Sequence, residues 1–153
     1  MKDNSISLLT SNGNSNRLPY LLKELNGSSE TILNFGSGKH YKNHEAMFDG
    51  TLISFDAYVE EINELPSGDK FDIVVCSNVL NVIPDDTEIE NILNYFDSLE
   101  GKKIYISVYE GDKSNVGKIT KIGTYQSNRA LKDWTLLWNR GYKRIGKYAY
   151  KEI

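Results

Sequence analysis

The sequence predicts an α/β fold in which a mostly parallel sheet ends in an antiparallel pair of strands. Between residues 31 and 109, short apolar strands alternate with helical patterns, as they do in sheets whose crossovers are helices. A glycine-rich turn follows the first strand, and an acidic residue ends the second. Residues 142–153 consist of two short runs around Gly146-Lys147 and predict a terminal hairpin.

The first half of the chain predicts two helices and two strands after a polar start. Residues 1–16 are rich in Ser and Asn, and we expect them to be flexible. Leucines at helical spacing predict a helix over 17–25. Two short apolar strands at 31–35 and 51–55 flank a weak helix at 39–48.

The second half continues the alternation and then changes character. The expected elements are a strand at 70–77, a helix at 87–99, a strand at 103–109, a loop at 112–122, a helix at 130–139 and the terminal hairpin. Only residues 57–70 separate the second strand from the third. This length allows one crossover but no additional strand, so any strand missing from the sheet must be an edge strand.

Composition and length predict one soluble domain spanning residues 1–153. The chain has no apolar run long enough to cross a membrane and no apolar signal-peptide core. Its single cysteine, Cys76, excludes an internal disulfide and fits a reducing compartment. We therefore expect a cytoplasmic protein without a membrane partner.

Charge is distributed unevenly along the chain. Residues 1–112 hold 8 Lys and Arg against 19 Asp and Glu, a net charge of −11, whereas residues 113–153 hold 10 against 2, a net charge of +8. Aromatic residues are interleaved with the cations in the segment 113–151. Such a segment could bind nucleic acid through phosphate contacts and base stacking. The alternative is that the lysines only solvate the outer faces of a terminal helix and hairpin.

The stretch ILNFGSGKH, residues 32–40, together with Asp56 is the most informative pattern. Gly36 and Gly38 would let the backbone approach a ligand without a Cβ in the way. Asp56 lies twenty residues beyond Gly36, where an acid can bind both hydroxyls of a ribose. The alternative interpretation is an ordinary strand-to-helix turn followed by a capping carboxylate. Together the two features favour a ligand that contains adenosine.

Three blocks, ILNFGSGKH, LISFDAY and FDIVVCSNVLNVIPD, resemble the first, second and fourth motifs of class I, Rossmann-like, S-adenosylmethionine-dependent methyltransferases. The likeness runs from about residue 31 to residue 153. Its small size and the segment GTYQSN resemble compact members from phages and bacteria. The family's sheet ends in an antiparallel pair, and its third strand lies at the edge. The resemblance therefore implies a short version that lacks this strand.

The resemblance also implies a cofactor and the residues that hold it. The cofactor would be S-adenosylmethionine, leaving S-adenosylhomocysteine as product. The residues that match the family's cofactor site are Asn34, Gly36, Gly38, Asp56, Ala57, Tyr58, Ser77, Asn78 and Val79. Candidates for the wall that faces the methyl acceptor are Tyr109, Tyr125 and Gln126. No catalytic base can be named.

Two positions depart from the family's pattern. Asn34 stands where an acidic residue usually ends the first strand, and His40 stands where a third glycine is usual. The sequence also lacks the Pro-Pro-aromatic motif of enzymes that methylate DNA amino groups, because Ser77 is followed by Asn-Val-Leu. His40 and His44 are four residues apart, but no third ligand is indicated, so no metal site is expected.

The leading hypothesis is a methyltransferase that acts on a nitrogen or oxygen acceptor, with nucleic acid as one possible acceptor. The first alternative is a non-catalytic relative that keeps the fold as a binding module, which Asn34 and His40 motivate. The second is an enzyme that uses a nicotinamide dinucleotide, against which the missing third glycine argues.

Overall fold

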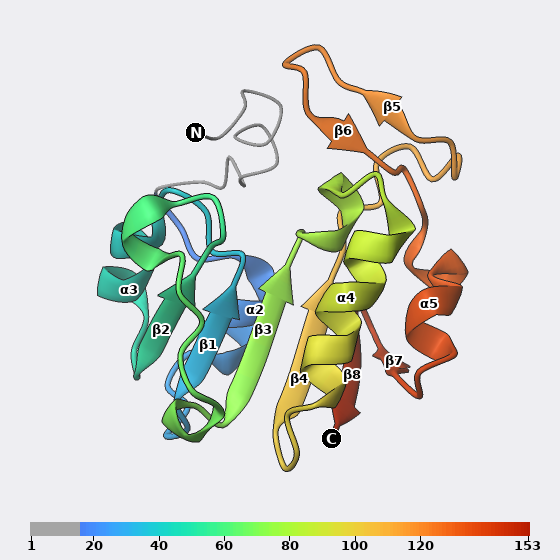
Figure 1. The fold of residues 1–153 in the computed structure, drawn as a ribbon. Coiled ribbons are helices and arrows are strands. Elements are labelled where there is room, and N and C mark those ends of the chain that lie inside the picture. The colour runs from blue at the N-terminus through green and yellow to red at the C-terminus, as the bar shows by residue number, and fades with distance from the viewer. Residues whose placement is uncertain (1–15) are drawn as a thin grey trace. The chain divides into compact units, whose positions relative to one another are not determined.

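The computed structural model describes residues 16–153, so nearly all of the segment expected to be flexible lies outside the described range. The described residues form two compact units that divide after Ser77. The first unit contains parallel strands and the second an antiparallel set (Figure 1). The predicted fold class, a parallel sheet followed by an antiparallel pair, is confirmed. The assignment of the whole chain to one domain stays a prediction.

Three parallel strands form the sheet of the first unit. Strand β1 (Ile32–Phe35) lies between β2 (Leu52–Phe55) and β3 (Ile73–Ser77). All four residues of β1 are buried, as expected for a central strand with neighbours on both sides. The register pairs Asn34 with Ser54 on one side and with Val75 on the other.

Two short helices accompany these strands. Helix α2 (Tyr20–Leu25) begins directly after Pro19, three residues later than the sequence predicts, and buries Leu21 and Leu22. Proline suits this place because it has no N–H to leave unsatisfied at a helix start. Helix α3 (Tyr41–Met47) begins after His40. Helix α2 packs against β3, and α3 packs against β2.

No strand lies between β2 and β3. Residues 56–72 contain only two single-turn 3₁₀ helices, η1 (Glu60–Ile62) and η2 (Gly68–Lys70). Strand β2 therefore forms one edge of the sheet. The prediction that the usual third strand is missing is confirmed.

The second unit contains an antiparallel sheet with a helix. Strand β8 (Tyr148–Glu152) lies between β4 (Lys103–Ser107) and β7 (Lys143–Ile145). The predicted Gly146-Lys147 turn joins β7 to β8, and Gly146 adopts a positive φ of 55°. Helix α4 (Asp86–Asp97) buries Ile89, Leu93 and Phe96.

Two regions of the second unit differ from the sequence-based expectation. The expected loop at 112–122 contributes β5 (Lys118–Ile119), which pairs with β6 (Tyr125–Gln126) in a separate two-stranded ribbon (Figure 1). The expected helix at 130–139 is divided into η4 (Leu131–Asp133) and α5 (Thr135–Trp138). The division falls at Trp134, whose ψ of 67° is not helical. Its fully buried indole donates to the carbonyl of Arg129.

One acidic side chain connects three elements of this unit. Asp97, at the end of α4, accepts hydrogen bonds from Arg140 and Lys151, both at 2.9 Å. Arg140 follows α5, and Lys151 belongs to β8. Because all three side chains are half-buried, this cluster is screened less than a fully exposed pair. Over residues 16–153, no helix combines the length and the apolar character needed to span a membrane.

Candidate functional site

The turn between β1 and α3 is built on left-handed glycines. Gly36 and Gly38 have φ values of 76° and 79°, a conformation that costs glycine little and other residues more. The amides of Gly36 and Ser37 donate to the carbonyl of Phe55, at 2.7 and 3.0 Å. The turn is therefore fastened to the end of β2.

Asp56 lies directly against this turn. One carboxylate oxygen, Oδ2, accepts from the Gly38 amide at 2.9 Å, and the other, Oδ1, accepts from the Tyr58 amide at 2.9 Å. The residue is only 4% exposed. The amide of Asp56 donates to the carbonyl of Ile62, and this bond attaches the end of η1 to Asp56. The structure thus places the glycine turn and the acid in direct contact.

Three of the predicted residues lie at the same edge of the parallel sheet. Gly36 and Asp56 follow Phe35 and Phe55, which are paired in the register of β1 and β2. Continuing the register of β1 with β3 brings Ser77 to the same level. The Ser77 hydroxyl oxygen is buried and has no hydrogen-bond partner among the described residues. A buried hydroxyl without a partner is unfavourable, so this atom is a candidate contact for a ligand.

The remaining predicted residues of the first unit surround this edge. Asn34 lies inside β1 and is 2% exposed, so it is in the strand and not at its end. Ala57 is exposed and Tyr58 is half-buried, both between Asp56 and η1. Apart from Asn34, the predicted residues of this unit lie at the carboxyl ends of its strands, where open α/β sheets bind ligands.

Asn78 and Val79 begin the second unit and precede η3 (Leu80–Val82). Asn78 has a positive φ of 58°, which asparagine tolerates better than most residues. Its amide donates to the carbonyl of Ser107 at 2.9 Å, next to the end of β4. Asn78 is exposed and Val79 is half-buried.

Asn81, within η3, bonds the backbone at or next to the candidate residues of the acceptor wall. Its side-chain oxygen accepts from the amide of Tyr109 at 3.3 Å, and its carbonyl accepts from the amide of Ser127 at 2.9 Å. Asn81 is 2% exposed. Tyr109 follows β4, and Ser127 follows Tyr125 and Gln126 of β6. The backbone amides of Tyr109 and Ser127 are therefore both bonded to the buried Asn81.

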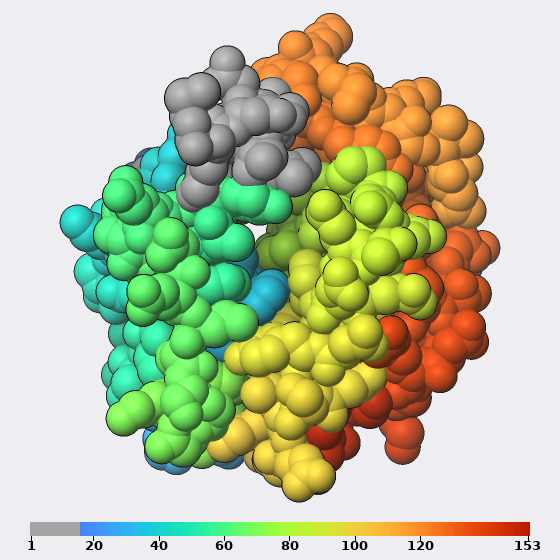
Figure 2. Space-filling view, in the orientation of Figure 1, coloured from blue at the N-terminus to red at the C-terminus, as the bar shows by residue number. Residues whose placement is uncertain are grey.

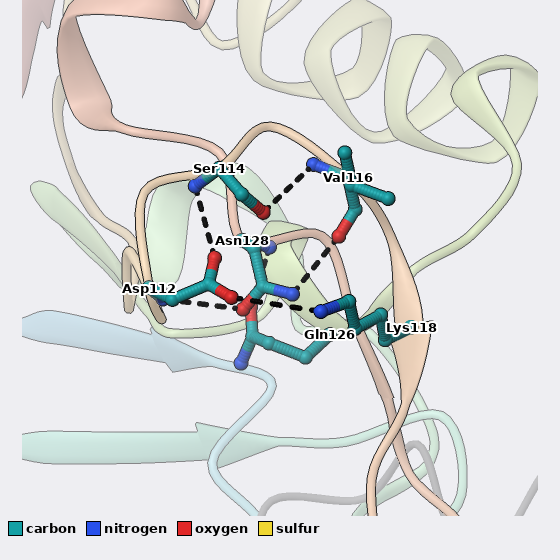
Figure 3. Close-up of polar contacts among 6 residues, drawn as sticks. All are labelled: Asp112, Ser114, Val116, Lys118, Gln126 and Asn128. Atoms are coloured by element: carbon teal, nitrogen blue, oxygen red, sulfur yellow. Dashed lines mark hydrogen bonds and ion pairs between the residues drawn. The ribbon is translucent and has the colours of Figure 1, made fainter.

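A second asparagine organises the segment between them (Figure 3). The Asn128 side chain donates to the carbonyl of Val116 at 2.9 Å and accepts from the amide of Asp112 at 3.4 Å. Gly111 packs so closely against it that an added Cβ would lie 1.9 Å from its Oδ1 atom. Asn128 has a φ of 54° and is 7% exposed. The Asn128 side chain therefore connects the segment that precedes β5 with the segment that follows β6.

Local charges add to this arrangement. The hydrogen bond from the Ser114 side chain is the main cause that holds the pKa of Asp112 below its usual 3.8, and the Ser114 amide and the nearby Lys118 ammonium lower it further. Lys118 and Asp112 form an ion pair at 3.8 Å. The dashed lines in Figure 3 mark this pair and the hydrogen bond from the Ser114 amide to Asp112. Both groups are largely exposed, so the pair contributes little to stability.

Two further predictions concern reactive groups. Cys76 is fully buried in β3, and this burial strongly raises the pKa of its thiol, which disfavours the reactive thiolate. His44 is buried in α3, whereas His40 precedes that helix and is half-buried. The described part of the chain contains no group of three His, Cys, Asp or Glu residues that could hold a metal ion.

Sequence reasoning did not identify Asn81 and Asn128. Both are buried asparagines whose side chains bond distant backbone, and such partners cannot be deduced from local patterns. A weak signal was available for Asn128. It follows the segment GTYQS and stands among residues that favour turns.

Comparisons with known proteins give little beyond these observations. No protein-family model matches the chain, and no curated protein matches it. Among solved structures, an S-adenosylmethionine-dependent methyltransferase from Mesorhizobium loti is similar over 80% of each chain, with 13% sequence identity and a TM-score of 0.45. A likeness this distant carries no argument about chemistry, which has to be inferred from the residues of this chain.

Proposed function

We propose that this chain binds S-adenosylmethionine and transfers its methyl group to a nitrogen or oxygen acceptor. One observation carries the proposal: the Gly38 amide donates to Asp56 across the ends of two adjacent parallel strands. This contact puts a carboxylate beside a turn in which Gly36 and Gly38 have no Cβ. The resemblance of the surrounding motifs to those of methyltransferases supports the choice of ligand.

The hydrogen-bonding capacity of Asp56 fits a ribose. Each carboxylate oxygen can accept about two hydrogen bonds, and each accepts one backbone N–H from within the chain. One acceptor position per oxygen is therefore left, which matches the two hydroxyls of a ribose. The two amide bonds also fix the orientation of the carboxylate before any ligand arrives.

A buried hydroxyl at the same edge supports the fit of the cofactor. The unpartnered Ser77 oxygen lies at the end of β3, next to the strand that leads into Gly36. It could bond a polar group of the methionine part. Asn34 is uncharged, so it offers at most a neutral hydrogen bond where the family usually has a carboxylate.

The chain's own contribution to the reaction would be alignment. S-adenosylmethionine supplies a methyl group that its sulfonium already activates. Asp56 would fix the ribose, and the glycine turn would admit the cofactor close to the backbone. Holding reactants in line can account for much of the rate of such a transfer. We assign no base.

Isothermal titration calorimetry with S-adenosylmethionine tests the proposal. We expect the wild-type chain to bind, and Asp56→Asn to bind at least about tenfold more weakly, because hydrogen bonds to a charged group contribute about 1.5–3 kcal/mol. Asp72→Asn is the matched control. Asp72 also accepts a backbone amide, that of Thr31, but it precedes β3 at the other end of the strands.

Ser77→Ala is a second variant, which removes only the unpartnered hydroxyl. We expect weaker binding with unchanged thermal stability. Absence of heat from the wild-type protein at millimolar ligand would refute the proposal. Displacement of the cofactor by NAD at equal concentration would instead favour a nicotinamide enzyme.

The second candidate function is a binding module without catalysis. The buried, uncharged Asn34 favours it, because it weakens the electrostatic attraction for the ammonium group of the cofactor. Cofactor binding without methyl transfer to DNA, RNA or protein substrates would support this alternative.

A further inference from the structure

The segment 113–132 has a strongly one-sided charge. It contains five Lys and Arg residues and no Asp or Glu. The β5–β6 ribbon, defined here as residues 117–126, lies within it, and Figure 2 shows this orange part of the chain at the molecular surface. Three of these cations pair with acids outside the segment, namely Lys113 with Glu110, Lys118 with Asp112 and Arg129 with Asp86. Each pair is at least partly exposed, so it contributes little and can be exchanged for another anion. The positive segment can therefore still attract polyanions.

Large aliphatic side chains are exposed in the same segment. Val116, Ile119 and Ile122 are 56%, 68% and 67% exposed. In the ribbon, Ile119 pairs with Tyr125, and Lys118 pairs with Gln126. Side chains at paired positions share a face, and successive positions alternate. One face of the ribbon is therefore apolar and aromatic, and the other carries a cation and an amide.

Two tyrosines are placed for contact with flat ligands. Tyr109 is 60% exposed, although its backbone is fixed to Asn81 beside the end of the ribbon. Tyr125 crosses the ribbon so closely that a Cβ on Gly117 would lie 2.1 Å from its hydroxyl. Gly117 thus leaves the space that the tyrosine side chain occupies.

The ribbon is held before any partner binds. Asn128 connects Asp112 with Val116 (Figure 3), and the amide of Asn115 donates to the Asn128 carbonyl. The amide of Leu131 donates to Glu110 at 2.7 Å. A surface that is ordered in advance loses less conformational entropy on binding.

We propose that the β5–β6 ribbon and Tyr109 bind single-stranded nucleic acid. Lys118 and Lys121 would contact phosphates, since the Lys118–Asp112 pair is solvent-exposed and easily exchanged. Tyr109 and Tyr125 would stack on bases, and the exposed isoleucines would cover their edges. A base that is a methyl acceptor must leave a duplex to be reached, which favours the single strand.

An anionic membrane is the competing polyanion. Insertion into a bilayer requires a continuous apolar face. Here the apolar face of the ribbon consists of the single pair Ile119 and Tyr125, and the exposed Thr120 and Lys121 separate Ile119 from Ile122. The observations therefore favour nucleic acid.

This inference deepens the proposed function by naming the acceptor class, and it depends on that function only for the acceptor role. Binding itself can be measured without the cofactor. If oligonucleotides fail to bind while calorimetry detects S-adenosylmethionine, the ribbon proposal falls and the proposed function stands. If oligonucleotides bind while calorimetry detects no S-adenosylmethionine, the ribbon proposal stands and the proposed function falls.

The test is fluorescence anisotropy of the full chain with short mixed-sequence oligonucleotides, as single strands and as duplexes, over a salt series. For Lys118→Gln/Lys121→Gln we expect the slope of log affinity against log salt to become shallower by about 1.4, or about 0.7 for each lost phosphate contact. The matched control is Lys143→Gln/Lys147→Gln, two exposed lysines of the other hairpin. We expect its slope to equal that of the wild type.

A stacking variant separates base contacts from general charge attraction. Tyr109→Ala should weaken single-strand binding at least about fivefold, while Tyr109→Phe should keep most of it. Equal losses in the ribbon and control variants would overturn the proposal, as would equal affinity for duplex and single strand. Binding to phosphatidylserine vesicles but not to oligonucleotides would overturn it in favour of a membrane.

Discussion

At the scale of single residues, asparagine takes positions that combine a left-handed backbone with a needed side chain. Asn78, Asn115 and Asn128 have φ values of 58°, 63° and 54°. Glycine would adopt these angles with less strain, but it could not make the bonds of Asn115 to Asp133 or of Asn128 to Val116. Asparagine therefore serves both requirements in the loop that supports the ribbon.

The pKa of Asp112 gives a test of this loop. Because Ser114 and then Lys118 favour the charged form, the carboxylate contributes to stability above its usual pKa of 3.8 and loses that contribution as the pH falls through the lowered value. A carbon-detected NMR titration should give a pKa below 3.8. Ser114→Ala should move it upward more than Lys118→Gln does. A larger effect of the lysine would contradict the assigned cause.

Cys76 gives a test of burial. Its thiol is fully buried, and desolvation raises its pKa, so the reactive thiolate is rare in the folded protein. We expect iodoacetamide at pH 8 to leave the native chain unmodified and to alkylate it rapidly in denaturant. Mass spectrometry measures both rates. Comparable rates in the two states would show that β3 is accessible.

At the scale of elements, side-chain bonds to backbone define where segments begin and end. Asp85 precedes α4 and accepts from the amide of Thr87 at 2.9 Å, which satisfies one of the free amides of a helix start. The segment between β4 and η4 is fixed in a similar way by Asn128 and Glu110. Both arrangements consist of polar side chains that bond backbone groups, and not of apolar packing.

The cap of α4 can be tested by substitution. Asp85→Ala should lower the free energy of unfolding by about 1 kcal/mol, because it removes the cap. Glu90→Ala removes a carboxylate from an exposed position of the same helix and should change the free energy of unfolding by less than about 0.5 kcal/mol. Urea denaturation followed by circular dichroism measures both. Equal effects would mean that charge, and not capping, matters.

The brace of the ribbon can be tested without straining the backbone. Asn128→Gly keeps the positive φ accessible but removes the side-chain bonds to Asp112 and Val116. We expect faster amide hydrogen exchange at Asp112 and through residues 117–126, with unchanged exchange in α4. Unchanged exchange in the ribbon would show that other contacts hold it.

At the scale of the whole molecule, charge separates the two units. Residues 1–77 hold 6 Lys and Arg against 11 Asp and Glu, and residues 78–153 hold 12 against 10. The net charges are therefore −5 and +2. The proposed cofactor residues lie mainly in the acidic unit, and the proposed polyanion surface lies in the basic one.

Ligand-linked stability tests the whole chain. If S-adenosylmethionine binds only the folded state, a concentration 100 times its Kd should stabilise the protein by about 2.7 kcal/mol. We expect a rise in Tm that grows with the logarithm of ligand concentration, measured by scanning calorimetry. Asp56→Asn should reduce this rise, and Asp72→Asn should not. A wild-type Tm that does not depend on the ligand would contradict binding.

Local sequence patterns predicted most of the regular elements. The apolar runs of β1 and β3 and the glycine turn between β7 and β8 are where the sequence places them, because side-chain period and turn chemistry are local properties. The helix expected over 130–139 is divided at Trp134, where the backbone that buries this side chain is not helical, so tertiary packing overrides helix propensity. The two-residue strands of the ribbon carry too little pattern to be recognised.

The order of the elements, the glycine turn and the acid after the second strand follow from local patterns of residues. The folded chain was needed to see that Gly38 and Asp56 touch, that the Ser77 hydroxyl is buried without a described partner, and that Asn81 bonds the amides of both Tyr109 and Ser127. The physical reason is that these contacts join residues far apart in the chain. Strand register and backbone hydrogen bonds create such contacts, and no local pattern encodes them.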